Sequence, residues 1–231
     1  GFEARFQGSV ESVQDGGVGY SLKGLVNVPV SDRFAVRASG FYRFDDGFIN
    51  SIGNNPIPSL TTPGVNIVDG TVVEDGINSL DTFGGRISAL YAPSKAFSLT
   101  LTAQIQNINS DEDHIIDADP TTLKPLNDGF VQSKYHSDTV DTKYRAFGAT
   151  LNWDLGAATL VSVTSYSTFE QDIHADAAIA SGLTGGPPLA SVVTYYFGDD
   201  VARPLSAVLP QTTSTDKLSQ ELRLLSPEND T

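Results

Sequence analysis

The stretch FSLTLTAQIQNI, residues 97–108, decides the fold class of this 231-residue chain. Apolar and polar residues alternate along it as far as Ile105, and its apolar positions are Phe97, Leu99, Leu101, Ala103 and Ile105. Successive side chains of a β-strand point to opposite faces of the sheet, so this period of two predicts a strand with one apolar and one polar face.

The same alternation recurs along the rest of the chain, and it predicts an all-β fold of about eight strands. Between residues 161 and 169 the pattern is less regular; there we assign Val161, Val163 and Phe169 to the apolar face. The expected strands are 2–12, 20–30, 34–42, 83–91, 97–108, 147–153, 161–169 and 217–227.

The lengths of the connections also alternate. Short polar turns are expected at 31–33, 93–96 and 154–157, with a further short turn at 14–17 in the first hairpin. Between them lie long segments, approximately 44–82, 110–142 and 171–214. Long structureless loops are uncommon in compact domains, whereas short turns on one side and long loops on the other are typical of outer-membrane barrels. We therefore expect one antiparallel up-and-down meander that forms part of a larger transmembrane β-barrel.

Aromatic residues mark both ends of the expected strands on the apolar face. The four beside the short turns are Phe34, Tyr91, Phe97 and Trp153, and the four at the opposite ends are Tyr20, Tyr42, Phe83 and Phe169. Two aromatic rows separated by aliphatic positions are typical of the girdles of a membrane barrel. A soluble β-sandwich whose aromatic residues cap its core is the alternative, because it shows the same alternation.

Composition narrows the possible functions. The formal net charge of −14 argues against general nucleic-acid binding, and the absence of cysteine excludes disulfides, thiolate metal sites and cysteine nucleophiles. No window of 18 apolar residues is present, and the first ten residues lack the pattern of a secretory signal. Either the protein stays in the cytoplasm or the chain is a piece whose signal lies upstream.

The polar face of the expected strands carries both signs of charge. Its cations are Arg5, Lys23, Arg37, Arg43, Arg86 and Arg223, and its acids include Glu3, Glu11 and Glu221. This face is therefore expected to be wet. Cross-strand pairing and solvation are the alternative to direct ligand contact at each of these positions.

Residues 20–49, YSLKGLVNVPVSDRFAVRASGFYRFDDGFI, closely resemble the start of the barrel in TonB-dependent receptors. That family has a Pro-hydrophobic-Ser-Asp turn, here at 29–32, followed by a strand ending in Gly-Phe-Tyr-Arg and Gly-Phe-Ile, here at 40–43 and 47–49. The stretch 217–227, KLSQELRLLSP, resembles a later strand, and 85–91 looks like an intervening one. The resemblance covers essentially the whole chain in the right order.

The resemblance implies a bacterial outer-membrane protein that takes up a scarce nutrient with energy delivered by the TonB complex. The family has an N-terminal plug and a barrel of 22 strands, so we expect this chain to be the first part of such a barrel. The implied partners are outer-membrane lipid, TonB through the plug, and a ferric siderophore, a cobalamin-like molecule or an oligosaccharide as substrate, with no cofactor. A passive porin and a soluble adhesive or structural β-protein are the alternatives.

Substrate recognition is expected in the three long segments and at the arginines near their ends. Arg43 is the best candidate for an anionic ligand, with Arg37 and Arg86 beside it on the polar face. The further candidates are Asp111, Asp113, His114, His136, Tyr195 and Tyr196.

The acidic cluster at 111–119 holds either a cation or only water. Its spacing matches no metal motif, so the identity of any metal stays open. The run Asp-Gly-Gly-Val-Gly at 15–19 lacks the third glycine of a dinucleotide fingerprint, and no serine has a nearby histidine and acid in a nucleophile arrangement. We therefore expect no enzymatic activity.

Overall fold

The computed structural model describes ten segments of the chain: residues 1–14, 16–52, 57–58, 66–68, 73–111, 114–119, 121–125, 129–132, 137–176 and 208–226. Eight long strands dominate the described residues, and among these residues there is no helix. Their bounds are β1 (Glu3–Ser12), β2 (Val18–Ser31), β3 (Phe34–Asp45), β8 (Leu80–Ser94), β9 (Phe97–Ser110), β11 (Thr139–Asp154), β12 (Thr159–Asp176) and β13 (Val208–Leu225). No described segment forms a helix long and apolar enough to cross a membrane.

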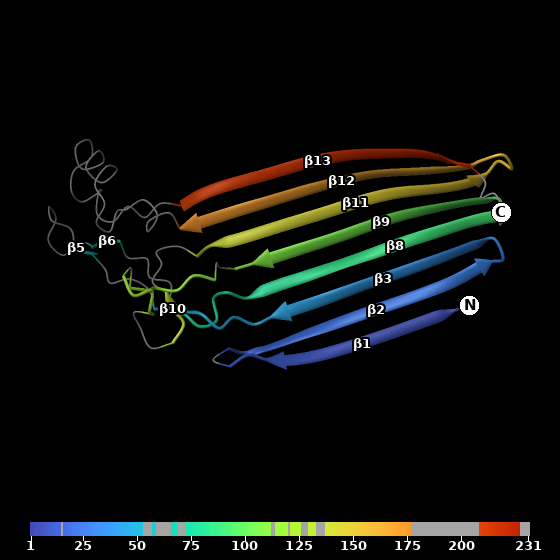
Figure 1. Ribbon diagram of the computed structural model, residues 1–231. Helices are drawn as coiled ribbons and strands as arrows, with labels where there is room; N and C mark the ends of the chain where they lie inside the picture. Colours follow the sequence, from blue (N-terminus) through green and yellow to red (C-terminus); the bar gives the residue numbers. More distant parts are fainter. Residues whose placement is uncertain are drawn as a thin grey trace, which may run out of the picture.

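These eight strands form one sheet in the order β1-β2-β3-β8-β9-β11-β12-β13 (Figure 1). Every pairing between neighbours is antiparallel. The predicted all-β meander of eight strands with sequential neighbours is therefore confirmed. The sheet does not close on itself, because β1 and β13 lie at opposite edges of it.

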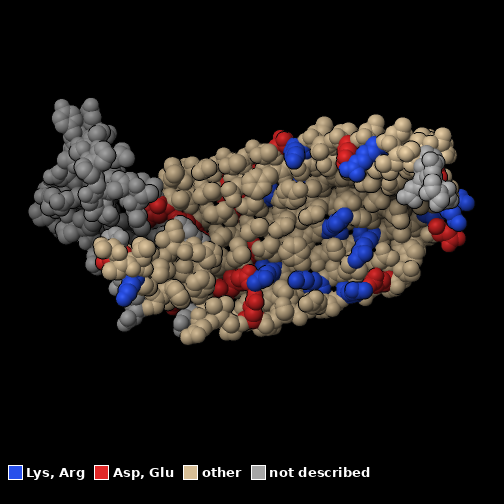
Figure 2. Space-filling view, in the orientation of Figure 1, with Lys and Arg blue, Asp and Glu red and all other residues tan. Residues whose placement is uncertain are grey.

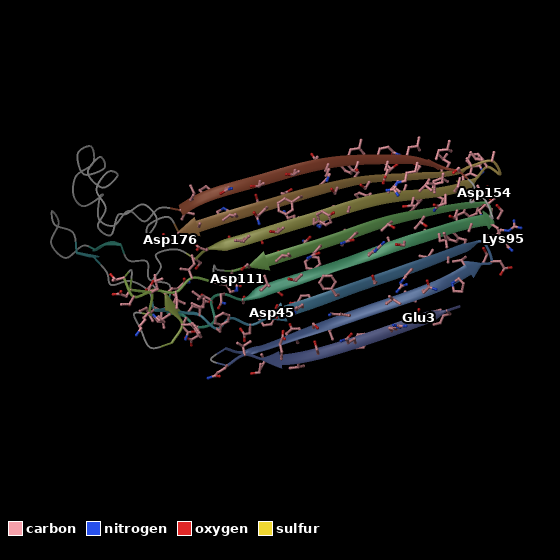
Figure 3. All side chains as sticks on the ribbon, in the orientation of Figure 1. Glu3, Asp45, Lys95, Asp111, Asp154 and Asp176 are labelled. Atoms are coloured by element: carbon pink, nitrogen blue, oxygen red, sulfur yellow. The ribbon has the colours of Figure 1, made fainter. Side chains whose placement is uncertain are left out.

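Short and long connections leave the sheet at opposite ends. The turns β2–β3, β8–β9 and β11–β12 lie at one end, called the turn end here, together with the N-terminus and the end of β13 (Figure 1). Asp45, Asp111 and Asp176 lie at the other end, the loop end, and Lys95 and Asp154 lie at the turn end (Figure 3). The short turn after β1 is the exception that the sequence predicts, because it lies at the loop end (Figure 1).

The strands are longer than the alternation indicates. β12 continues to Asp176 and β13 begins at Val208, where Asp176 and Val208 are directly opposite each other. Residues 171–176 and 208–214 therefore belong to the sheet and not to the long segment predicted at 171–214. Antiparallel pairing uses backbone N–H and C=O groups, so it continues where both faces are polar and the alternation of side chains has ended.

The other two long segments contain short strands. β4 (Asn50–Ile52), β7 (Val73–Glu74) and β10 (Val131–Gln132) form a small sheet, and β5 (Ile57–Pro58) pairs with β6 (Asn66–Val68). β10 pairs with β4 in parallel, which joins the connection after β3 to the connection after β9. This parallel pair lies outside the eight-stranded sheet, so it does not change the meander.

The described apolar core belongs to this small sheet and its flanks. Ile49 and Ile77 are 1% and 5% exposed, and they are the buried hydrophobic residues of the described part of the chain. Asn78 Oδ1 accepts hydrogen bonds from the backbone N–H groups of Phe48 and Ile49, both at 2.8 Å. The large sheet is a single layer, and its apolar face stays exposed, with Phe6 at 78% and Leu218 at 72%.

Candidate functional site

The pairing register gives the large sheet two chemically different faces. One row of directly opposed residues runs across seven strands as Val26, Ala38, Ile87, Ala103, Phe147, Tyr166 and Leu218. We call the face that carries this row the apolar face. The neighbouring row lies on the other side of the sheet, called the polar face, and includes Asn27, Arg37, Ser88, Thr102 and Ser165.

The predicted face of β12 is wrong. Tyr166 is opposite Phe147, and Phe169 is opposite Tyr144, so Phe169 lies on the polar face. Val161 and Val163 share that parity and lie there too. Both faces of this strand mix apolar and hydroxyl side chains, so its own sequence does not fix the orientation; the register with β11 and β13 does. Tyr166 and not Phe169 continues the aromatic residues of the apolar face.

At the turn end, the structure brings the four predicted aromatic residues together. Phe34 is opposite Tyr91, and Phe97 is opposite Trp153. The ring centroids of Tyr91 and Phe97 are 6.5 Å apart, and those of Phe97 and Trp153 are 6.1 Å apart, both pairs edge to face. This geometry is favourable for aromatic rings and produces a continuous row across four strands.

At the loop end, the boundary between apolar and polar side chains crosses the apolar face obliquely. Tyr20 and Phe44 are opposite each other on β2 and β3, with ring centroids 5.5 Å apart. From β3 to β11 the last apolar residue of each strand is opposite a polar residue of the next strand. These pairs are Phe44 with Asp81, Phe83 with Asn107, and Ile105 with Arg145. The boundary therefore moves toward the turn end as it crosses the sheet.

The total displacement of the boundary between β2 and β13 can be counted in residues of β2. On β2 the boundary lies at Tyr20. On β13 it lies at Leu218, and the row of opposed residues through Leu218 crosses β2 at Val26, six residues nearer the turn end. Six residues span about 20 Å and six strand spacings span about 29 Å, which gives an angle of about 35°. Strands of transmembrane barrels are tilted by a similar angle, roughly 35–45°.

Polar groups just beyond the boundary are hydrogen bonded to one another. The Tyr166 hydroxyl donates to Asp216 Oδ1 at 3.3 Å, and the Tyr42 hydroxyl donates to Asp81. Lys143 Nζ lies 3.0 Å from Glu170 Oε1, and Arg145 donates to the backbone oxygens of Gln106 and Tyr144. Charged groups on the apolar face are thus satisfied locally where the apolar band ends.

The polar face collects cations over the first half of the sheet. Figure 2 shows Lys and Arg side chains gathered over β1 to β8, with acidic side chains on both sides of them along the strands. By register, the cations of this face on β1 to β9 are Arg5, Lys23, Arg37, Arg43 and Arg86, and its acids are Glu3, Glu11 and Asp45. The formal balance of this region is therefore +2, although the whole chain carries −14.

Arg43, the leading sequence candidate, is neutralised by two carboxylates. Its Nη2 lies 2.9 Å from Glu11 Oε1 and 2.7 Å from Asp45 Oδ1, and its Nε donates to both oxygens of Asp45. Gly19 is opposite Glu11, and its lack of a side chain leaves room for this bridge across β2. Arg43 thus links β1 to β3, and its guanidinium is already used by groups of the sheet.

Lys23, Arg37 and Arg86 form no ion pair with any residue in the described part of the chain. Arg86 is opposite Ser39 on one side and Gln104 on the other, and Lys23 is opposite Phe41. A hollow of about 570 Å³ extends over β1 to β9 here. Its lining residues include Arg5, Lys23, Ser39, Phe41, Arg86, Gln104 and Gln106.

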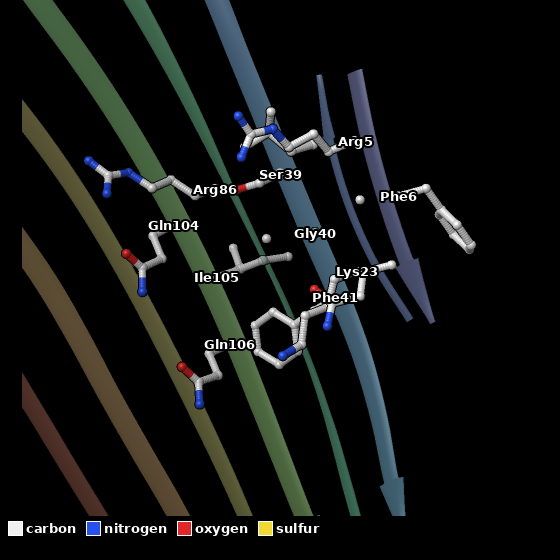
Figure 4. A pocket seen from close by; sticks show the side chains of 14 residues that line it. Arg5, Phe6, Lys23, Ser39, Gly40, Phe41, Arg86, Gln104, Ile105 and Gln106 are labelled. Carbon is white, nitrogen blue, oxygen red and sulfur yellow. The ribbon is translucent and has the colours of Figure 1, made fainter. Parts of the chain in front are cut away.

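Side chains of five strands border this hollow from one side of the sheet. In Figure 4, Arg5, Lys23, Phe41, Arg86, Gln104 and Gln106 extend to one side of the strands, whereas Phe6 extends to the other. The sequence pattern does not identify Lys23, Gln104 or Gln106 as ligand contacts. Their polar-face parity could have identified the two glutamines, but the lack of a partner for Lys23 is visible only in the structure.

The structure describes only two of the six candidates in the long segments, Asp111 and His114. Asp111 Oδ2 accepts a hydrogen bond from Ser79 Oγ at 2.5 Å, and the ring of His114 lies 6.1 Å from that of Phe48. Asp113, His136, Tyr195 and Tyr196 lie outside the described residues. Within the described ranges, no group of three or more metal-ligating side chains occurs.

A scan against protein-family models and searches of curated proteins and of solved structures found no match to this chain.

Proposed function

We propose that this chain is part of the barrel wall of a TonB-dependent outer-membrane receptor, which takes up a scarce nutrient at the cell surface. The apolar face of the sheet lies against lipid, and the polar face lines the lumen. The long connections lie at the cell surface, and the short turns face the periplasm. The edges of β1 and β13 pair with further strands of a closed barrel, because unpaired backbone groups are costly in hydrocarbon.

The oblique boundary of the apolar face carries this proposal. Strands in a barrel are tilted, so a flat membrane surface meets each strand at a different residue, and the boundary must move across the register. An average displacement of one residue per strand corresponds to a tilt of about 35°. In a sheet that is amphipathic but does not cross a membrane, nothing requires the boundary between apolar and polar side chains to shift by this amount from strand to strand.

The height of the apolar band supports the same arrangement. On β9 it extends from Phe97 to Ile105, and on β8 from Tyr91 to Phe83, eight residue steps in each case. Eight steps measure about 27 Å along a strand, or about 22 Å along the normal of a membrane at this tilt. With the side chains at both ends, this approaches the band of about 25 Å found on outer-membrane barrels.

Accessibility of two neighbouring residues tests the membrane arrangement. The chain has no cysteine, so once any cysteine in the rest of the receptor is replaced by serine, Thr100→Cys and Leu101→Cys each give a single labelling site, on the polar and the apolar face of β9. In the receptor reconstituted in vesicles, a spin label at 101 should collide with dissolved oxygen, and a label at 100 with a water-soluble nickel complex. Equal access of the nickel complex to both labels would contradict a lipid-facing sheet.

Energy coupling separates a receptor from a porin. In cells that carry the complete receptor, uptake should stop when TonB is deleted or the proton gradient is collapsed. Uptake that continues at an unchanged rate would support passive diffusion through a porin and would contradict the receptor.

A further inference from the structure

We infer that Lys23, Arg37 and Arg86, together with Gln104 and Gln106, form an oxyanion-binding site on the lumen face, for a small molecule that carries carboxylate or phosphate groups. This inference deepens the proposed function by assigning a ligand chemistry to the polar face, and it depends on that face being turned away from lipid.

Two of the five cations on this part of the polar face are paired with carboxylates of the described residues, and three are not. Arg5 lies 2.5 Å from Glu3, and Arg43 lies between Glu11 and Asp45, so these two cations are satisfied within the sheet. The remaining three cations have no carboxylate partner among the described residues. Arg37 and Arg86 are on adjacent strands, one same-face position apart, which places their Cα atoms about 8 Å from each other. Two guanidinium groups at this spacing can act on one oxyanion or on two neighbouring ones.

The side chains directly opposite these cations on the neighbouring strands are uncharged. Gln104 is opposite Arg86, and Gln106 is opposite Gly84, the position that faces Phe41. The glutamine amides and the Ser39 hydroxyl donate and accept hydrogen bonds without adding charge. The Phe41 ring offers an apolar contact to the body of a ligand. The combination of few convergent polar groups with an aromatic wall is typical of small-molecule sites, and so is the volume of about 570 Å³ of the hollow that Lys23, Arg86 and the glutamines line. Arg37 does not line this hollow and lies beside it, one same-face position from Arg86.

The cations also lie at a favourable depth in the sheet. The site lies level with the middle of the apolar band, because Arg37 and Arg86 neighbour Ala38 and Ile87, which are opposite each other. Cations at this depth are far from the acidic loop end, where Asp45 and Asp111 lie (Figure 3). Screening limits repulsion by those carboxylates to about 8 Å at physiological salt. An anion that reaches the site therefore meets a local positive potential in spite of the acidic chain.

Side-chain amide signals report binding directly. We would titrate the ¹⁵N-labelled complete receptor, in detergent micelles, with inorganic pyrophosphate in one arm and citrate in a second, at constant ionic strength set with NaCl. The signals of Gln104 and Gln106 should shift and saturate, whereas that of Gln220, on the apolar face, should not move. Saturation by one titrant alone identifies the phosphate or the carboxylate as the preferred group.

Charge variants separate a site from diffuse attraction. The pair Arg37→Gln/Arg86→Gln should lower the affinity at least tenfold, and the pair Arg33→Gln/Lys95→Gln, which removes two cations from the turns, should change it less than twofold. Arg37→Lys/Arg86→Lys keeps the charge and the fold and should lose less than the glutamine pair. Absence of a saturable shift, or an equal loss in the turn variant, would overturn the site.

The outcome is independent of the test of the proposed function. If the label at 101 reports lipid but the glutamine signals do not respond, the sheet is a barrel wall without this site. If the glutamine signals respond but both labels report water, the anion site exists on a sheet that does not line a membrane lumen.

Discussion

The ring of Phe41 lies against the backbone of Gly84, the residue directly opposite it on β8. A Cβ atom at Gly84 would lie 2.7 Å from Phe41 Cε1 and 2.9 Å from the backbone oxygen of Ile105. The glycine therefore provides the space that the aromatic ring occupies on the polar face. This contact fixes the position of the apolar wall of the hollow between Lys23 and Gln106.

Gly84→Val should destabilise the protein by about 1–3 kcal/mol, because the added side chain meets a ring that can move and a backbone oxygen that cannot. Urea unfolding of the detergent-folded protein, followed through the fluorescence of Trp153, measures the change. Gly24→Val is the matched control, since a Cβ there would meet nothing within 4 Å. Equal losses for both variants would show that the close contact at Gly84 is not the cause.

Leu101→Arg should cost roughly 2–4 kcal/mol of folding free energy in a bilayer, because residue 101 lies in the middle of the apolar band. Thr100→Arg, on the polar face, is the control and should be tolerated. The fraction of folded protein after reconstitution, scored by resistance to heat and protease, measures both. An Arg at 101 that leaves this fraction unchanged argues that the apolar face is not in lipid.

Arg43→Gln should weaken the attachment of β1 without affecting anion binding. The guanidinium bridges Glu11 and Asp45, but about half of its surface is exposed, so we expect only a small loss of folding free energy. Glu11→Gln should cause a similar loss, and the double variant should lose less than the sum, because both changes break the same bridge. Pyrophosphate affinity should stay within twofold; a tenfold fall would return Arg43 to the ligand site.

The stability of the turn that Asp119 begins should depend on pH through the ionisation of its carboxyl group. Its Oδ1 accepts hydrogen bonds from the backbone N–H groups of Thr121 and Thr122 and from the Thr122 hydroxyl, and these bonds lower the pKa of the carboxyl group. A lowered pKa means that the stabilisation is fully present above the unfolded value of about 3.9 and is lost as pH falls through the folded value.

NMR titration of the Asp119 carboxyl carbon measures this pKa, and the backbone signals of Thr121 and Thr122 should change over the same pH interval. Asp119→Asn should remove that coupled change while leaving the strands intact. A midpoint at or above the unfolded value would show that the three hydrogen bonds are not formed in solution.

Local patterns made much of the architecture predictable. Alternation at residues 97–105 determined both the strand and its faces, because neighbouring side chains of a strand must point to opposite sides. The same reasoning placed Arg37 and Arg86 on one face and Ile87 and Leu101 on the other, and the register agrees. Short turns between regular alternations also determined which strands pair within each hairpin, since adjacent strands joined by two to four residues can only pair antiparallel.

The tertiary structure decided what depends on partners distant in the sequence. β12 carries apolar residues on both parities, so only its register with β11 and β13 places Tyr166 on the apolar face and Phe169 on the polar one. The pairing of Arg43 with Glu11, 32 residues away, likewise leaves no trace in either local pattern. Sequence alternation determines which face a side chain takes along a regular strand, whereas strand register and long-range ion pairing decide which charges remain free for a ligand.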